Sequence, residues 1–531
     1  MTEVNMQLRS YFEENYARFA GAANNRAIPS ARDGLKTVHR RILFTLKHMA
    51  PAIGKEKKAA KAVGEIMATV HPHGDSSIYD ALVRLAQPFQ MMIPLVKGVG
   101  NFGAVDGSSA AAYRYTECKL HPYAEKIYFK SIDENSVDFI PNYDQTSEEP
   151  KFLPARLPMI LINGAPDGSM GVGFKSTIPT HNPGEVIELV KYVIQQIADQ
   201  KAVDTDEMFA ILPGPDFPTG GQIVLDNYER MKELYNTGAS TLKIRSTYTV
   251  TPGWVTFNSV PYGVTTQKIL ESLNTAMHGS VGKDGKKKGP VEILDASITE
   301  IIDASNEKEG VKILVKLMSG VSAPPELLEA LFKHSELETS YGYQFTCLDS
   351  EGSLKQYSLT DIIQEWLEFR VSSIKRCAMH QIEVLKEREH IIMGLLICFP
   401  RIEEVIKIIR AAASEEEAIL VLVESLKITK KQAHAISNMR IGKLNKLDVD
   451  ALANEARSVR SSVKERFELL QDTQNILSKI YDEVETLNTE IVIPRKTEIV
   501  IAGAPIKALS KQKKNTLTKI PSKRSKGTLA V

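Results

Sequence analysis

Two stretches of apolar residues at heptad-like spacing constrain the fold of this chain more than any other feature. They lie about 80 residues apart, and their members are Ile374, Ile382 and Leu385, then Val459, Val463, Phe467, Leu470, Leu477, Ile480, Val484 and Leu487. Steps of mostly three, four or seven residues place side chains on one face of a helix. The pattern predicts an antiparallel coiled coil with a compact helical insert, and an ordinary helical bundle is the alternative. Length favours the coil, since about 30 residues of helix reach ~45 Å.

Charge is unevenly distributed along the chain. The 531 residues are too many for one domain, and their formal net charge is only +1. Residues 1–130 carry 18 basic and 11 acidic side chains, and residues 507–531 carry eight basic and none acidic. The region between them is therefore acidic. Basic ends on an acidic body predict that a polyanion binds at a defined place.

Several classes of protein are disfavoured by what the sequence contains. The four cysteines (Cys118, Cys347, Cys377 and Cys398) form no CxxC pair, so neither a disulfide framework nor a zinc site is indicated. The N-terminus is polar and acidic, unlike a signal peptide. There is no run of 18 apolar residues, so we expect no membrane span and a cytoplasmic protein.

The N-terminal region is predicted to be helical. Apolar residues recur at helical spacing in residues 8–20 and 33–49, and two further helices are expected at 58–69 and 76–86. The last two are joined by His71-Pro72-His73-Gly74-Asp75. Two short helices across a tight turn indicate a helix-turn-helix or winged-helix reader of DNA, although plain helical domains also contain this geometry.

The rest of the chain changes character twice. From about 150 to 345, short β-branched runs broken by Gly and Pro predict an α+β region with an antiparallel sheet. Residues 359–490 are almost wholly helical, and from 503 onward a Lys/Ser/Thr-rich segment is predicted to be disordered.

Cationic and imidazole side chains are concentrated near the predicted turn. His71 and His73 flank a proline, and no third metal ligand follows at a suitable spacing, so phosphate contact is favoured over metal binding. A cationic cluster lies just upstream and consists of Arg26, Arg32, Lys36, His39, Arg40 and Arg41. A solvated helix face is the ordinary explanation for such charges. Their position beside a predicted helix-turn-helix favours phosphate binding.

Tyr115 follows a glycine-rich loop, in Ala-Ala-Tyr-Arg-Tyr-Thr-Glu. Tyrosine is a poor nucleophile at neutral pH, because its reference pKa is about 10. A neighbouring arginine and imidazole could stabilise both a phenolate and the charge on a phosphoryl centre. Most of the 17 tyrosines are expected to be packing or interface residues.

Several long motifs occur in a fixed order. The first three are RAIPSARDGLKTVHRRILF, HPHGDSSIYDALVRLAQPF and GNFGAVDGSSAAAYRYTE, and later ones include VDFIPNYDQT, LPMILINGAPDG, LETSYGYQF and PRKTEIV. Over roughly residues 20–500 the chain resembles the breakage–reunion core of type IIA DNA topoisomerases. The likeness is closest to the A subunits of bacterial gyrase and topoisomerase IV.

The resemblance implies a role for individual residues. Tyr115 matches the tyrosine that becomes linked to a 5′ phosphate of DNA, and Arg114 matches the arginine that holds the scissile phosphate. His73 and Arg26 match residues beside that phosphate. The positions that match DNA-groove residues are Lys36, His39, Arg40, Arg41 and His71.

Two further sites are implied by the same resemblance. Ser76 and Asp80 match the pair associated with quinolone binding through a water-bridged metal, and their i, i+4 spacing puts them on one helix face. Met170 matches the position of an isoleucine that kinks DNA, and methionine could also wedge between base pairs. Tyr113 replaces a residue that is usually smaller or aliphatic, and we interpret it as a packing residue.

The resemblance also implies an α+β multidomain fold. The expected parts are a winged-helix cleavage domain at 1–150, a tower domain at 151–345 and coiled-coil arms at 346–500. Those arms would carry a small helical C-gate dimerisation domain at about 400–455, and a basic disordered tail would follow at 501–531.

The implied function is transient cleavage of both strands of double-stranded DNA and passage of a second duplex. This isomerase would act as a homodimer with a separate ATPase/Toprim (B-type) subunit, giving an A2B2 complex. That partner is expected to bind Mg²⁺ and ATP. The sequence of this chain shows no Asp/Glu cluster that resembles the metal-binding carboxylates of the family, and no nucleotide-binding loop. A non-catalytic DNA-binding homologue and a structural coiled-coil dimer with a basic head are the alternatives.

The chain also departs from the gyrase pattern. It ends near residue 531, which leaves no room for the β-pinwheel that wraps DNA, so relaxation or decatenation is expected rather than strong supercoiling. Its length resembles the A subunits of some large bacteriophages or a shortened bacterial chain. The expected location is the cytoplasm of a bacterium or of an infected host cell.

Overall fold

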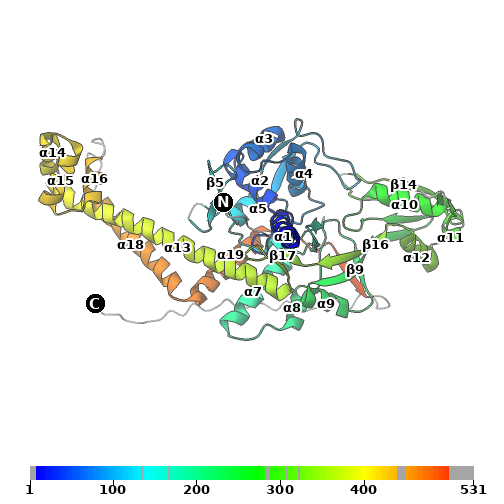
Figure 1. The fold of residues 1–531 in the computed structure, drawn as a ribbon. Helices are drawn as coiled ribbons and strands as arrows, with labels where there is room; N and C mark the ends of the chain where they lie inside the picture. The colour runs from blue at the N-terminus through cyan, green and yellow to red at the C-terminus, as the bar shows by residue number, and fades with distance from the viewer. Residues whose placement is uncertain are drawn as a thin grey trace. The chain divides into compact units, whose positions relative to one another are not determined.

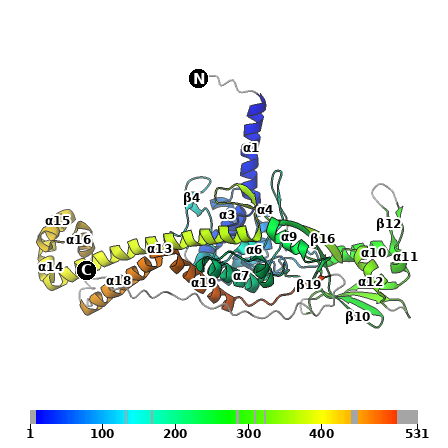
Figure 2. The same ribbon diagram turned by 90° about the horizontal axis from the view of Figure 1, so that it is seen from below.

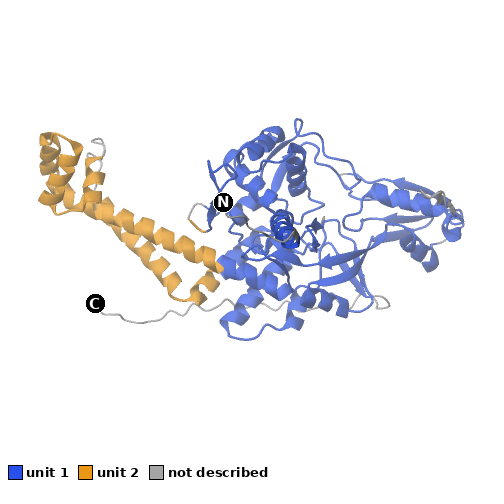
Figure 3. Cartoon of the chain, in the orientation of Figure 1, with its two compact units in different colours: residues 1–132, 137–370, 480–521 blue, residues 133–136, 371–479, 522–531 orange. Residues whose placement is uncertain are grey.

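The chain divides into two compact units, which Figure 3 shows in different colours. The computed structural model describes residues 8–130, 132, 135–165, 168–281, 287–306, 309–320, 323–438 and 449–501. Unit 1 consists of residues 1–132, 137–370 and 480–521, and unit 2 of residues 133–136, 371–479 and 522–531. The finer division into four domains stays a prediction.

The N-terminal part of unit 1 contains four helices and a small sheet (Figure 1). The helices are α1 (Leu8–Ala27), α2 (Thr37–Met49), α3 (Ala59–Thr69) and α4 (Asp75–Ala86). Three short antiparallel strands lie in the order β1 (Lys57–Lys58), β3 (Glu117–Leu120) and β2 (Val96–Val99). The four helices predicted in this region are confirmed, although α1 is longer and α2 begins later than expected.

Asp33 determines where α2 begins. Its fully buried carboxylate accepts the N–H of Leu35 at 3.1 Å and that of Leu153 at 3.0 Å. The Arg40 guanidinium donates to the same carboxylate at 2.7 and 3.1 Å. These bonds hold residues 33–36 in a turn, so the helix starts only at Thr37. Its apolar face is fully buried at Ile42, Leu43 and Leu46.

A short turn separates α3 from α4 and carries both histidines. The backbone N–H of His71 donates to the Ile66 carbonyl at 2.8 Å, and that of His73 donates to the His71 carbonyl at 2.8 Å. Gly74 then takes the N-cap position of α4, which buries Ile78 and Leu82 completely. Helices α2, α3 and α4 contact one another. The turn therefore holds the two imidazoles at the start of α4, while assignment as a winged helix stays a prediction.

Two hairpins and three short helical segments follow in unit 1. The hairpins are β4 (Phe139–Pro141) with β5 (Glu148–Pro150), and β6 (Ser169–Met170) with β7 (Lys175–Ser176). The helical segments are α5 (Pro122–Ala124), the π-helix η1 (Glu125–Phe129) and α6 (Met159–Ile162).

Two four-stranded sheets form the mixed region of unit 1. The first has the antiparallel order β10 (Tyr248–Thr251), β11 (Trp254–Phe257), β15 (Ile313–Leu317), β14 (Ile298–Asp303). The second has the order β16 (Glu338–Gln344), β9 (Ala239–Arg245), β8 (Gln222–Leu225), β19 (Glu498–Ile501). Smaller pairs are β12 (Ser280–Val281) with β13 (Lys287–Lys288), and β17 (Thr346–Leu348) with β18 (Leu354–Gln356). The predicted α+β character is confirmed.

Six helices accompany these sheets. They are α7 (Pro183–Ala198), α8 (Thr205–Ile211), α9 (Glu229–Thr237), α10 (Thr266–His278), α11 (Glu292–Asp295) and α12 (Pro325–Lys333). One continuous core joins the first sheet to three of them, α10, α11 and α12, through fully buried side chains such as Val255, Ile269, Leu294 and Leu331. The alternating burial of β11 and β15 supplies the sheet side of this core.

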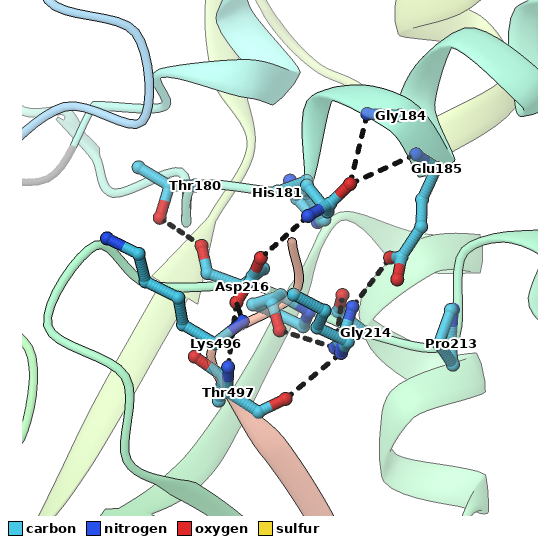
Figure 4. A network of polar contacts seen from close by, with 12 residues as sticks. Thr180, His181, Gly184, Glu185, Pro213, Gly214, Asp216, Lys496 and Thr497 are labelled. Carbon is cyan, nitrogen blue, oxygen red and sulfur yellow. Dashed lines mark hydrogen bonds and ion pairs between the residues drawn. The ribbon is translucent and has the colours of Figure 1, made fainter. Parts of the chain in front are cut away.

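Strand β19 was not predicted, and it pairs in parallel with β8. Asp216, which is fully buried, accepts the backbone N–H groups of Lys496 at 3.0 Å and Thr497 at 2.8 Å (Figure 4). Its second carboxylate oxygen accepts from the Asn182 side chain at 3.1 Å. These bonds fix the segment that leads into β19.

Arg495 completes the attachment of this segment to unit 1. Its guanidinium donates to Glu185 at 2.6 Å and to the carbonyls of Gly214 and Pro215 at 3.1 and 2.8 Å. Burial raises the pKa of Glu185 to about 7, and the Arg495 charge opposes that rise. The carbonyl groups of Gly214 and Pro215 therefore receive their hydrogen bonds from the Arg495 side chain and not from the backbone of a neighbouring strand.

Unit 2 contains most of α13 (Leu359–Cys398), which is 40 residues or about 60 Å long. Helix α18 (Val449–Gln471) runs antiparallel to it, since Arg388 bonds Glu455 at 2.8 Å and Arg466 bonds Gln381 at 2.5 Å. Helix α19 (Thr473–Glu490) follows directly. The long helices of the heptad prediction are therefore present, and supercoiling stays a prediction. Phe467 departs from the predicted buried stripe, because this residue is 44% exposed.

A small helical cluster lies between α13 and α18 in sequence. It consists of the short 3₁₀ helix η3 (Phe399–Arg401), α14 (Ile402–Ala411), α15 (Glu415–Leu426) and α16 (Lys430–Ser437), packed around residues such as Leu422 and Ala433. Its role in dimerisation stays a prediction. Residues 439–448 of the predicted insert and residues 502–531 of the predicted tail lie outside the described residues.

Figure 2, turned from the view of Figure 1, shows α1 extending away from the other helices of unit 1. Among the described residues, no helix combines the length and apolarity needed to cross a bilayer.

Candidate active site

Tyr115 lies in the loop between β2 and β3, and this residue is 65% exposed. The Arg114 guanidinium carbon is 4.7 Å from the centre of the Tyr115 ring, a cation–π distance. The Tyr115 N–H donates to the Ala112 carbonyl at 2.9 Å. The phenol is therefore accessible to a large ligand and lies beside a positive charge.

Tyr113 and Thr116 attach this loop to α4. The Tyr113 hydroxyl donates to Asp75 at 2.9 Å, and its ring packs edge-on against Tyr79 at 5.6 Å. The Tyr79 hydroxyl lies 2.6 Å from the Ala111 carbonyl and 2.9 Å from the Thr116 hydroxyl. The expectation that Tyr113 packs is confirmed, and the structure adds a hydrogen bond that raises its pKa. The tyrosine loop is thus bonded to the helix that follows the histidine turn.

His71 and His73 stack with their ring centres 4.3 Å apart and their planes 16° from parallel. Arg41 Nη1 lies 2.8 Å from His71 Nδ1, and Arg26 Nη1 lies 3.1 Å from His73 Nε2. A guanidinium can only donate, so both imidazole nitrogens accept. Burial, with smaller electrostatic contributions from His73, Arg41 and Arg26, lowers the pKa of His71 to about 4. His71 is therefore neutral near pH 7.

An open hollow of about 460 Å³ adjoins the histidine pair. Arg26, His71, His73 and Met170 line it together with Ser77. Met170 comes from the β6–β7 hairpin and is 76% exposed. The structure thus brings together four of the predicted site residues. Tyr115 and Arg114 are not among the lining residues, and the Tyr113–Asp75 bond attaches their loop to the first residue of α4.

A second, smaller cavity of about 50 Å³ is lined by Lys36, His39 and Arg84. Burial and, to a smaller extent, the charges of Lys36, Arg84 and Arg40 together lower the pKa of His39 to about 3. Two predicted groove residues therefore lie together. Arg84 was missed, although its position four residues after Asp80 on α4 would have placed it on the same helix face.

Arg40 and Arg41 are bonded to carboxylates within the protein. Arg40 pairs with buried Asp33, and its side chain is only 10% exposed. Arg41 pairs with Glu149 at 2.7 and 2.6 Å. We therefore interpret Arg40 as a residue that builds the groove rather than one that meets a phosphate directly. Glu149 lies 108 positions from Arg41, so no local signal marks it, whereas Asp33 lies only seven residues before Arg40.

Ser76 and Asp80 lie on α4, and both are exposed. Because both residues belong to this helix and are four positions apart, they lie on one helix face as predicted. Drug binding at this pair stays a prediction. Within the described ranges, no group of three or more His, Cys, Asp and Glu residues could hold a metal ion.

Comparisons with known proteins agree with these features. The family model for the A subunit of DNA gyrase/topoisomerase IV matches residues 26–485. The DNA gyrase A subunit of Kosmotoga olearia is 35% identical over 90% of this chain and 56% of its own length. Those of Leptospira biflexa and Streptococcus pneumoniae are each 34% identical, over 93% and 94% of this chain and 57% and 58% of their own lengths. The chain therefore spans somewhat more than half the length of these relatives.

Proposed function

Because this chain belongs to the family of DNA gyrase and topoisomerase IV A subunits, we propose that it cuts and rejoins DNA in a type IIA topoisomerase. The observation that best supports this role is an exposed Tyr115 beside Arg114, bonded through its loop to the helix that follows the stacked histidines. In a degenerate homologue that only binds DNA, these residues would have no reason to be retained together.

The proposed chemistry follows from the groups present. The Tyr115 oxygen attacks a backbone phosphorus and the phosphorus–O3′ bond breaks. The phosphate is then esterified to tyrosine and keeps its bond to the 5′ oxygen of the DNA. The phenol loses its proton, and the departing 3′ oxygen gains one. Arg114 and Arg26 supply positive charge where the phosphoryl oxygens gain negative charge. The reverse attack by the 3′ hydroxyl reseals the strand without an external energy source.

The remaining elements of the proposal concern partners and cofactors. One tyrosine cuts one strand, so a double-strand break calls for a homodimer. A separate ATPase/Toprim subunit, giving an A2B2 complex, would bind the ATP and the Mg²⁺ that assist cleavage. Passage of one duplex through another relaxes and decatenates DNA by itself, so these are the proposed reactions. We place the complex in the cytoplasm of a bacterium or of an infected host cell.

The test is a plasmid assay with the purified chain, Mg²⁺, ATP and a candidate ATPase/Toprim subunit. Denaturation with detergent should trap linear DNA that carries protein on its 5′ ends, and ATP should permit relaxation or decatenation. DNA binding without any covalent adduct, with a partner that is active with another member of the family, would instead support the non-catalytic homologue.

Met170 is expected to act as a wedge between base pairs. Its exposed, flexible side chain lies beside the hollow that contains the histidines, and an apolar wedge kinks DNA when it inserts. Met170→Ala should reduce DNA bending and lower the yield of cleaved complex by roughly tenfold, equivalent to about 1.4 kcal/mol. Energy transfer between dyes on the ends of a short duplex would measure the bend. Met318→Ala, at a partly exposed methionine in the mixed region, is the matched control. An unchanged bend in the Met170 variant would contradict the assignment.

The basic segment 507–531, which lies outside the described residues, is expected to add DNA affinity without sequence information. Replacing its eight Lys and Arg residues by Gln should weaken binding. It should also make the slope of log affinity against log salt concentration less steep, by as much as about 0.9 per lost phosphate contact. Affinity measured over a salt series, with mapped cleavage positions, tests this. A changed cleavage pattern would contradict it.

A further inference from the structure

We propose that Glu149 is a positioning residue, which orients Arg41 so that Arg41 fixes the ring of His71 and, through stacking, that of His73. The inference rests on the proposed function, because it assigns Glu149 a part in the same cleavage site. Among the described residues, Glu149 does not line the hollow, and its side-chain bonds go to Arg41 and not to the tyrosine loop.

The contacts form a single chain of bonded groups. Glu149 is 5% exposed, and its two carboxylate oxygens accept from Arg41 Nε at 2.7 Å and Nη2 at 2.6 Å. This bidentate geometry fixes the plane of the guanidinium. The remaining nitrogen, Nη1, then points at His71 Nδ1, 2.8 Å away. With Nδ1 accepting, the single proton of the neutral ring lies on Nε2.

Glu149 can hold Arg41 because its own strand is fixed. It lies in β5, which pairs with β4, and the loop of this hairpin is bonded to the end of α3. The Asn142 side chain donates to the Thr69 carbonyl at 2.7 Å, and the Tyr143 hydroxyl donates to the Ala68 carbonyl at 2.7 Å. These two carbonyls lie just before His71 in sequence. The carboxylate and the histidine turn are therefore held to the same helix end.

Charged and titratable groups surround His71. His73 lies on the same turn, Arg41 comes from α2, Arg26 comes from α1, and Glu149 lies behind Arg41. Of these four groups, Glu149 alone is negative. Without its carboxylate, Arg41 has no fixed plane, and the hydrogen bond that sets the His71 tautomer is lost.

The experiment compares Glu149→Gln with Glu148→Gln in the full chain. Glu148 is the adjacent, exposed carboxylate on the same strand, so it is the matched control. In the A2B2 complex, Glu149→Gln should slow cleavage at saturating DNA by on the order of 100-fold, since small misplacements of reacting groups have effects of that size. DNA affinity should change little, and Glu148→Gln should behave like the wild type.

A second measurement does not depend on catalysis. Nitrogen chemical shifts of labelled histidines distinguish an accepting ring nitrogen from a protonated one. They should report a single His71 tautomer in the wild type and in Glu148→Gln, and a mixture in Glu149→Gln. If Glu149→Gln does not fold, Arg41→Lys replaces it, because lysine keeps the charge but cannot bridge Glu149 and His71 together.

The Arg41→Gln background supplies the decisive comparison. If Glu149 acts only through Arg41, adding Glu149→Gln to Arg41→Gln should produce no further loss of cleavage. Additive losses, or an unchanged His71 tautomer in Glu149→Gln, would overturn the proposal. Absence of cleavage by the wild-type complex would count against the proposed function, and the tautomer measurement would still decide the role of Glu149.

Discussion

Replacing Tyr115 by phenylalanine is expected to abolish covalent attachment of this chain to DNA. The substitution removes one oxygen atom and leaves the ring that stacks under Arg114. Removing the nucleophile of a covalent catalyst slows the reaction by on the order of 10⁴-fold or more. DNA binding should persist, since the cationic groups of the site are unchanged. The measurement is the amount of protein–DNA adduct trapped with detergent, together with the DNA affinity of the same sample.

Tyr248→Phe is the control for this experiment. Tyr248 is a partly exposed tyrosine on the edge strand β10, so the same loss of a hydroxyl there should leave cleavage intact. Adduct formation by Tyr115→Phe at a rate near that of the wild type would show that another group is the nucleophile, and the proposed function would then lose its central residue.

Asp216→Ala is expected to lower the free energy of unfolding by about 3 to 5 kcal/mol. It would leave the buried Thr497 N–H, the partly buried Lys496 N–H and one of the two Asn182 amide N–H groups without their acceptor. Each unsatisfied buried donor costs about 1–3 kcal/mol. The loss should be greatest where β19 joins β8. Hydrogen exchange of the amides in residues 496–501, measured alongside denaturant unfolding, would report both the size and the place of the effect.

Asp216→Asn is the matched variant for this prediction. It keeps one acceptor oxygen for Lys496 and Thr497 but sets its amide nitrogen against that of Asn182. Its cost should therefore be smaller, about 1 to 2 kcal/mol. If Asp216→Ala unfolds within experimental error of the wild type, or if exchange at 496–501 is unaltered, the attachment described for this segment does not stabilise the sheet.

Local features of the fold could be predicted because local sequence determines them. The apolar stripe of α2 and the Pro/Gly turn before α4 both depend on residues close together in sequence, and both are present. Exposure of Phe467 was not predicted, because heptad spacing alone does not tell which side of a stripe the partner helix covers.

Contacts between distant residues account for most of what was missed. Glu149 pairs with a residue 108 positions away, and Asp216 accepts from amides 280 and 281 positions away. No local pattern marks either carboxylate. Asp33 is different, since it lies only seven residues before Arg40, and a pair at that distance is short enough to be inferred from the sequence. The resemblance predicts which residues form the site and gives no information on how they are held.

The pairing of β19 with β8 has a consequence for synthesis of the chain on the ribosome. The two strands are 276 residues apart, measured from Gln222 to Glu498, whose side chains bond at 2.9 Å. At ribosomal rates, roughly 15 to 55 s pass between the emergence of the first strand and that of the second. Throughout that interval the β8 edge has no partner, and an uncovered edge invites pairing with other nascent chains. Strand β19 can cover this edge only after helices α13 to α19 have been translated. The synthesis of residues 498–501 therefore determines when the β8 edge stops being available to other nascent chains.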